Sequence, residues 1–192
     1  MKVFKTVDSL RKWRSDLSEE KTLGLVPTMG ALHEGHLSLI RRSRDENDWC
    51  LATIFVNPTQ FDRKEDLESY PSSLEADLKM LEESGCDAVF VPTSEDIYEN
   101  RIASDSFDFA GLDKVMEGRY REGHFDGVAT IVRKLFRLTE PDRAYFAEKD
   151  FQQLQIIKGM VREEELPVEF SSCEIIGQYG CLARRLITPM LD

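Results

Sequence analysis

The sequence predicts an α/β protein with a doubly wound parallel sheet of the Rossmann-like type. Apolar runs of strand length alternate along the chain with segments of helical periodicity. The run at residues 50–56 is almost continuously apolar, which is typical of a strand buried on both faces of a parallel sheet. Polar loops follow several predicted strands, and ligands of such sheets bind beyond the carboxyl ends of the strands. We therefore expect these loops to converge on one site.

The spacing of apolar residues and the residues at segment ends predict the individual elements. The segment 126–139 carries apolar residues three and four positions apart, as an amphipathic helix does, with Asp126 as its expected N-cap. The helix 73–84 is expected to open at a Ser cap and to close at Gly85. The stretch 60–70 is a charged loop suited to a lid. The expected strands are 22–27, 50–56, 88–91, 143–146 and 168–173, and the expected helices are 7–16, 35–47, 73–84, 126–139 and 151–164.

Length and composition restrict the class of protein. The 192 residues are enough for one domain with a sizeable core, which we expect at residues 1–176, followed by an atypical C-terminal segment at 177–192. The net charge of −11 disfavours nucleic-acid binding, because phosphate backbones are held by basic surfaces. No run of 18 apolar residues occurs, so no membrane span is expected. The four cysteines lack paired spacing, so we expect reduced thiols and a cytoplasmic protein.

The motif His33-Glu34-Gly35-His36 is the strongest functional signal, because it opens a helix directly after a strand and a Pro/Gly turn. Gly30 and Gly35 would let the backbone approach a ligand closely, and the N–H groups of the new helix would favour a negative group. Two imidazoles three residues apart can both reach a phosphate chain, so the motif indicates nucleotidyl transfer. A chance pairing or a zinc site is the alternative. Zinc is disfavoured because the chain has only three His and no Cys-x-x-Cys pair.

Two further loops carry polar residues just after predicted strands. Asn57 and the proline after it form a sharp turn, and the Gln60 amide beyond it is suited to a hydroxyl or a carboxylate. In the second loop, Lys149 is suited to place a point charge on a phosphate. A solvated loop is the alternative for Gln60. Asp150 and Gln153 have the spacing of a capping box, so a purely structural role is open for them.

Four segments stand in order along the chain and together resemble one known family. They are PTMGALHEGH at 27–36, FVNPTQF at 55–61, GHFDGVAT at 123–130 and EKDFQQL at 148–154. They resemble the pantoate–β-alanine ligases, or pantothenate synthetases, from near residue 1 to about residue 170. The resemblance implies condensation of pantoate with β-alanine to pantothenate, through a pantoyl-adenylate. It also implies ATP and Mg²⁺ as cofactors and a cytoplasmic homodimer.

The same resemblance implies roles for individual residues. His33, His36 and Lys149 would be the catalytic groups, because they would contact the ATP phosphates. The nucleotide-binding residues would be Met29, Gly35, His36, Lys149 and Asp150, the last of these at the ribose. Pantoate would be held by Gln60 and Gln153 at its hydroxyls and carboxylate, and by an apolar wall of Phe146, Ile131 and Val132 at its methyl groups. Asp77 matches a position near the family's magnesium ion.

The chain also departs from the family pattern. The family usually carries Gly-Leu-Ala-x-Ser-Ser-Arg-Asn, whereas this chain has Cys-Leu-Ala-Arg-Arg-Leu-Ile-Thr at residues 181–188, with Leu186 and Ile187 in place of a serine and an arginine. Ala147 stands where the family has glycine. We also expect the family's smaller C-terminal domain to be absent. Two alternatives therefore stay open: another H-x-G-H adenylyltransferase with a different acceptor, or a non-catalytic protein that binds pantoate or nucleotide.

Overall fold

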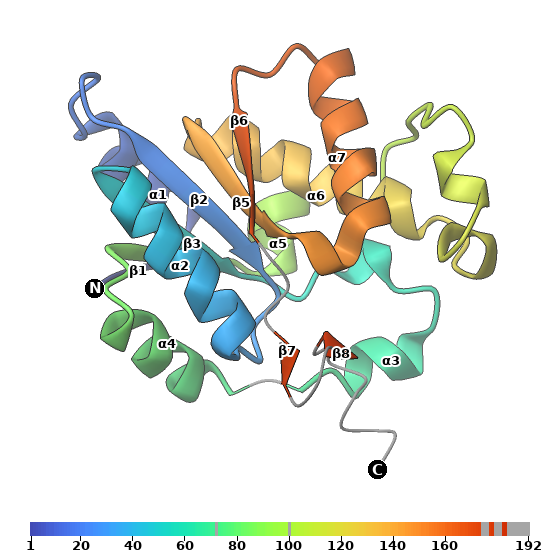
Figure 1. The fold of residues 1–192 in the computed structure, drawn as a ribbon, viewed down its shortest axis with the longest axis horizontal. Helices are drawn as coiled ribbons and strands as arrows, with labels where there is room; N and C mark the ends of the chain where they lie inside the picture. Colours follow the sequence, from blue (N-terminus) through green and yellow to red (C-terminus); the bar gives the residue numbers. More distant parts are fainter. Residues whose placement is uncertain (72, 100, 174–176, 179–181, 184–192) are drawn as a thin grey trace.

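A six-stranded parallel sheet forms the centre of the protein in the computed structural model, which describes residues 1–71, 73–99, 101–173, 177–178 and 182–183 (Figure 1). The strand order is β1-β4-β3-β2-β5-β6, and every neighbouring pair is parallel. The predicted fold class is therefore confirmed. The strands are β1 (Lys2–Phe4), β2 (Leu23–Thr28), β3 (Trp49–Ile54), β4 (Ala88–Phe90), β5 (Arg143–Ala147) and β6 (Glu169–Cys173), with a separate antiparallel pair, β7 (Gly177–Gln178) and β8 (Leu182–Ala183).

The path of the chain through the sheet determines where a ligand can bind. From the central strand β2 the chain passes to β3 and then outward to β4, and it returns on the other side of β2 with β5. The direction of winding therefore reverses between β2 and β5. The loops that follow these two strands leave in different directions, and this is the position where parallel sheets bind their ligands.

Helices cover both faces of the sheet (Figure 1). Alternate strand residues face the two layers: Leu25 packs in the cluster that contains α1, α6 and α7, and Val26 packs in the cluster that contains α2 and α4. No helix within the described residues is long and apolar enough to cross a membrane. The α-helices are α1 (Val7–Ser15), α2 (Glu34–Glu46), α3 (Lys64–Glu68), α4 (Leu74–Glu83), α5 (Ser94–Tyr98), α6 (His124–Thr139) and α7 (Phe151–Glu163), and the 3₁₀ turns are η1 (Pro58–Gln60), η2 (Leu112–Lys114), η3 (Gly118–Tyr120) and η4 (Glu148–Asp150).

Several short elements, among them β1, α3 and α5, are not predicted by the sequence pattern. β1 is only three residues long and becomes a strand by pairing in parallel with β4, which is distant in the sequence. α3 lies inside the charged stretch at 60–70, which the sequence predicts to be a loop. Segments of three to five residues are too short to show a period, so their structure follows from tertiary contacts.

The predicted N-cap of α6 is wrong. α6 begins at His124, two residues before Asp126, and its N-cap is Gly123. The φ of Gly123 is +74°, which glycine adopts easily. The Asp126 carboxylate instead accepts a hydrogen bond of 3.1 Å from the backbone N–H of Phe107, so it anchors the long connection before α6. At α4 and α7, the side chains of Ser73 and Asp150 make no cap hydrogen bond.

Candidate active site

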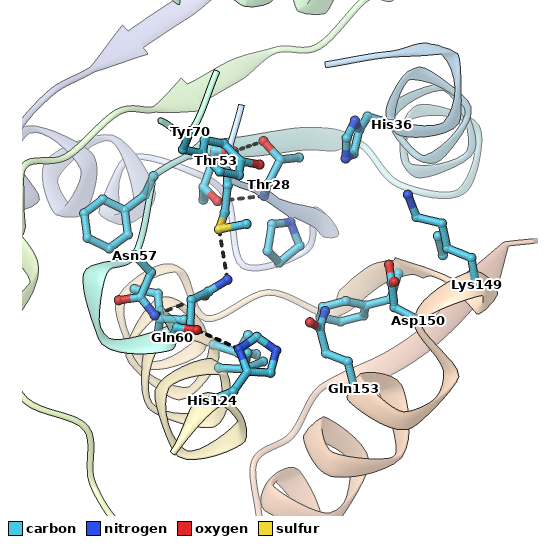
Figure 2. Close-up of a pocket in the computed structure, with 18 of the residues that line it drawn as sticks. Thr28, His36, Thr53, Asn57, Gln60, Tyr70, His124, Lys149, Asp150 and Gln153 are labelled. Carbon is cyan, nitrogen blue, oxygen red and sulfur yellow. Dashed lines mark hydrogen bonds between the residues drawn. The ribbon is translucent and has the colours of Figure 1, made fainter. Parts of the chain in front are cut away.

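The loops at the carboxyl ends of β2, β3 and β5 meet α6 and α7 around a cavity of about 540 Å³ (Figure 2). Every residue that the sequence predicts for the site lines this cavity, with the exception of Asp77. These lining residues are Met29, His33, Gly35, His36, Gln60, Ile131, Val132, Phe146, Lys149, Asp150 and Gln153. The sheet thus brings together four segments that are far apart in the sequence.

The two histidines of the motif cap α2 reciprocally. The Nδ1 atom of His33 accepts a hydrogen bond of 3.1 Å from the backbone N–H of Gly35, and Nδ1 of His36 accepts one of 3.3 Å from the backbone N–H of His33. A neutral imidazole whose Nδ1 is an acceptor carries its proton on Nε2. Each ring therefore has a donor, Nε2–H, on the edge opposite its cap.

This capping changes the expected source of hydrogen-bond donors for an anion. The sequence suggests that the backbone N–H groups at the start of α2 face the ligand, but the N–H of Gly35 is used by His33. Gly35 is required here, because a Cβ at this position would lie 2.8 Å from Cε1 of the His33 ring. Ring N–H groups thus take over part of the role expected of the backbone.

The environment of His36 keeps its ring neutral. Burial lowers its pKa to about 3, with further lowering from the neighbouring His33 and from Lys149. The two histidine rings are 4.1 Å apart between centroids, and Figure 2 shows the Lys149 amine on the same side of the cavity as His36. At neutral pH the site therefore combines an uncharged donor with a lysine.

The side chain of Gln60 is held by a buried amide. Nδ2 of Asn57 donates to Oε1 of Gln60 at 3.1 Å and to the carbonyl of Gly127 at 3.1 Å. Nε2 of Gln60 in turn lies 2.9 Å from the sulfur of Met29. Because Asn57 engages the Gln60 oxygen, the amide turns Nε2 toward Met29, which also lines the cavity. Gln153 lines the same cavity from α7 (Figure 2).

An apolar wall closes one side of the cavity. Ile131 and Val132 of α6 and Phe146 of β5 are all buried, as predicted for the wall. α6 approaches the η1 turn so closely that a Cβ at Gly127 would overlap the carbonyl of Thr59. This close contact fixes the wall relative to Gln60. Ala147, which replaces the family's usual glycine, also lines the cavity.

Several charged or polar lining residues are absent from the sequence-based site, among them His124, Arg121 and Glu117. Nδ1 of buried His124 donates to the backbone carbonyl of Gln60 at 2.7 Å, and Nη1 of Arg121 lies 3.1 Å from the Nε2 of His124. Arg121 also pairs with Glu117 at 2.7 Å. Burial is the main cause of the lowered pKa of His124. The sequence analysis explains the segment GHFDG, which contains His124, as the start of a helix. No local pattern in the sequence indicates that His124 contacts Gln60.

Asp77 has a different place from the one expected. Its Oδ2 accepts a hydrogen bond of 2.9 Å from the N–H of Ala31, and its Oδ1 accepts one of 2.8 Å from the N–H of Leu32. The side chain is 2% exposed and does not line the main cavity. Both carboxylate oxygens thus hold the turn after β2. The assignment of Asp77 to a metal stays a prediction.

The described residues also contain no group of three or more His, Cys, Asp or Glu side chains arranged to hold a metal ion. Among these residues, a metal ion would therefore find fewer than three such side-chain ligands at one place. The departures at residues 184–188 fall outside the described part of the chain, so the structure assigns Arg184, Arg185, Leu186 and Ile187 no position.

Relatives of known name align with most of the length of this chain. A pantothenate synthetase from Christiangramia forsetii is 49% identical over 189 residues, which cover 96% of this chain and 66% of the relative. One from Porphyromonas gingivalis is 51% identical over 187 residues, covering 95% of this chain and 65% of the relative. The chain thus spans about two thirds of the length of these relatives.

Solved structures agree with the sequence relatives. The pantothenate synthetase of Thermus thermophilus superposes with a TM-score of 0.86 at 43% identity, over 93% of this chain and 63% of that protein. A pantoate-beta-alanine ligase from Francisella tularensis, complexed with beta-gamma ATP and beta-alanine, superposes with a TM-score of 0.90 at 36% identity, over 93% of this chain and 69% of that protein. The family model described as pantoate-beta-alanine ligase matches residues 2–185. The chain therefore belongs to the pantoate–β-alanine ligase family.

Proposed function

We propose that this chain binds ATP and pantoate in the cavity and activates the pantoate carboxylate as pantoyl-adenylate, which β-alanine then converts to pantothenate. The main support for this proposal is that one cavity is lined by two kinds of residue, one suited to phosphates and one suited to a small acid. His36 and Lys149 line it together with Gln60 and the apolar wall of α6 and β5. The first pair suits a phosphate chain, and the second set suits a small acid with hydroxyl and methyl groups. Family membership supports the same pair of substrates.

In the first step, a pantoate carboxylate oxygen attacks the α-phosphorus of ATP. A new O–P bond forms while the bond from the α-phosphorus to the bridging oxygen breaks, and pyrophosphate leaves with the electron pair. The carboxylate is already ionised at neutral pH, so no general base is needed. The barrier lies in orienting the two reactants and in stabilising charge on the phosphates. We assign this stabilisation to the Nε2–H donors of His33 and His36 and to the Lys149 ammonium.

Polar and apolar contacts would together orient pantoate beside Gln60 and the apolar wall. The Gln60 N–H suits a carboxylate or hydroxyl oxygen, and Gln153 would hold a further polar group from α7. Phe146, Ile131 and Val132 would contact the methyl groups. Asp150 would contact the ribose, and Met29 and Gly35 would border the nucleotide.

In the second step, the amine of β-alanine attacks the acyl carbon of the adenylate. A C–N bond forms, the C–O bond to the phosphate breaks, and AMP leaves. Water competes with the amine for this mixed anhydride, so the cavity must exclude water while the intermediate is bound. The buried wall contributes to this exclusion.

Magnesium would enter this site with its nucleotide. Mg²⁺ is often held by substrate phosphates and water with only one or two carboxylates, which is consistent with the lack of a three-ligand group among the described residues. A cytoplasmic homodimer is proposed on family resemblance.

The decisive experiment is a pantoate-dependent exchange of labelled pyrophosphate into ATP, followed by product analysis with β-alanine. Exchange that requires pantoate, and is not supported by other small hydroxy acids, is the expected result. Exchange with a different acid would instead favour another H-x-G-H adenylyltransferase. Pantoate binding without exchange would favour the non-catalytic binding protein, which the replacement of Ser and Arg by Leu186 and Ile187 specifically supports.

A further inference from the structure

Behind the cavity, the hydroxyl of Tyr98 contacts the turn that carries Gln60. Tyr98 ends α5 and is 6% exposed, and it does not itself line the cavity. Its Oη lies 2.5 Å from Oδ1 of Asn57 and 3.0 Å from Oγ1 of Thr59. None of the four sequence motifs contains this tyrosine.

The donors and acceptors along this chain of contacts have only one consistent arrangement. The carbonyl of Gly127 can only accept, so the Asn57 atom facing it at 3.1 Å is Nδ2, and the atom facing Tyr98 is Oδ1. Tyr98 therefore donates to Asn57. The second N–H of the Asn57 amide donates to Oε1 of Gln60, which leaves Nε2 of Gln60 on the side of Met29.

We propose that Tyr98 is a positioning residue for the acid-binding part of the cavity. By donating to Asn57, the phenol fixes the orientation of the Asn57 amide, and Asn57 fixes the Gln60 amide with its N–H toward the ligand. The site thereby selects an oxygen acceptor, such as a carboxylate or hydroxyl group, at this position. Naming that ligand pantoate rests on the proposed function.

Burial makes this relay effective. Asn57 is 1% exposed and Gln60 is 8% exposed, so water does not readily replace a lost partner. A reversed Asn57 amide would set its oxygen against the Gly127 carbonyl and its N–H against the backbone N–H of Thr59. Without the phenol, Thr59 alone supports Oδ1 of Asn57, through contacts of 3.1 Å from Oγ1 and 3.4 Å from the backbone N–H. The Gln60 amide is then held less firmly.

The ring of Tyr98 has a packing role that must be separated from that of its hydroxyl. It lies 6.5 Å from the ring of Phe55 between centroids, and the Lys134 ammonium lies 5.4 Å from its centre. Tyr98→Phe keeps the ring and removes only the hydroxyl. It is therefore the informative substitution, and Tyr120→Phe, at a tyrosine that is 78% exposed and lies outside the lining of the cavity, is the matched control.

The test is a double-mutant cycle of Tyr98→Phe and Gln60→Ala, with the Kd for pantoate measured by calorimetry on the intact chain. We expect Tyr98→Phe to weaken pantoate binding by roughly five- to tenfold, the scale of one hydrogen bond. In the Gln60→Ala background it should have no further effect, and ATP binding should stay unchanged. Tyr120→Phe should match the wild type.

A second readout needs no substrate. In ¹⁵N-labelled protein, Tyr98→Phe should shift the side-chain amide resonances of Asn57 and Gln60, whereas Tyr120→Phe should leave them in place. Unchanged resonances, or an equal loss of pantoate affinity with and without Gln60, would overturn the positioning role. Shifted resonances in a protein that binds no pantoate would uphold the positioning role and overturn the proposed substrate.

Discussion

At the scale of single residues, each histidine of the motif uses its two ring nitrogens for different purposes. Nδ1 of His36 accepts from the His33 backbone and thus helps to cap α2, which leaves Nε2–H for a ligand. Because the pKa of His36 is lowered to about 3, this donor is uncharged at physiological pH. Under the proposed function, charge toward a phosphate would come from Lys149, which lines the same cavity.

Substitution of His36 tests whether its ring acts as an uncharged donor to a phosphate. We expect His36→Ala to raise the barrier of adenylate formation by about 3 kcal/mol, the scale of one preorganised donor, with little change in pantoate affinity. His36→Asn retains an acceptor near the Nδ1 position for the cap and lacks the distal donor, so it should lose exchange activity to a similar extent with less loss of stability. The measurement is pantoate-dependent pyrophosphate exchange at saturating pantoate. Unchanged turnover in either variant would rule out His36 as a phosphate ligand.

The same ring gives the stability a defined dependence on pH. The unfolded chain binds a proton at His36 below about pH 6.5, the ordinary value, whereas the folded chain does so only near pH 3. Between these pH values only the unfolded chain binds the proton, so the free energy of unfolding should fall as the pH is lowered through this window. Above about pH 6.5, the contribution of neutral His36 to stability is complete. Urea unfolding at pH 7.0, 6.0 and 5.0 should show a shallower fall in His36→Asn than in the wild type. Parallel curves would contradict the lowered pKa.

At the scale of elements, the turn between β2 and α2 is organised by a carboxylate on another helix. Asp77 of α4 accepts hydrogen bonds from the N–H groups of Ala31 and Leu32, and Ala31 has a φ of +49°. Non-glycine residues rarely adopt this conformation without support from their surroundings. The turn thus depends on a contact that crosses from one βα unit to the next.

Removal of this carboxylate should destabilise the fold whether or not a metal is present. Asp77→Ala leaves two N–H groups without their acceptor, so we expect a loss of about 2 to 3 kcal/mol in the free energy of unfolding. Glu75→Ala, at an exposed position of the same helix, is the control and should change stability by less than about 0.5 kcal/mol. Urea titrations with and without Mg²⁺ distinguish the roles. A loss that appears only with Mg²⁺ would support the metal assignment of Asp77.

The longer elements are predictable because their periodicity is local. α6, with apolar residues at helical spacing, agrees with its predicted range to within two residues at its start and matches its predicted end at Thr139. Its cap is not predictable in the same way. Asp126 is a residue type typical of an N-cap, but its carboxylate accepts from the backbone N–H of Phe107 instead. The side chain had two possible partners, and only the packed structure selects between them.

At the scale of the whole molecule, the reversal of winding between β2 and β5 assembles the cavity from loops that no local pattern connects. The residues proposed to bind the acid all lie in the described part of the chain and line the cavity. By resemblance, the triphosphate contacts at residues 185–187 are altered, since Leu186 and Ile187 replace a serine and an arginine. Under the proposed function, ground-state binding of pantoate and stabilisation of the transition state would therefore depend on different parts of the sequence.

We accordingly expect this chain to bind pantoate and to form pantothenate slowly. Loss of charge stabilisation around the phosphates lowers the rate more than it weakens binding of the acid. Calorimetry with pantoate, paired with the time course of pantothenate formation beside the Porphyromonas gingivalis relative, measures both quantities. Turnover equal to that relative would contradict the expectation and would indicate that Arg184 or Arg185 replaces the lost contacts.

The sequence by itself determined the fold class, the order of the main strands and helices, and the motifs that line the cavity. These follow from the alternation of apolar runs and from residue types at strand ends, which are local properties. Tertiary structure decided what each polar group contacts: the tautomers of the motif histidines, the attachment of Asp77 to the turn after β2, and the path from Tyr98 through Asn57 to Gln60. Most of these contacts join residues distant in the sequence, and each depends on atomic distances that only the packed sheet and helices establish.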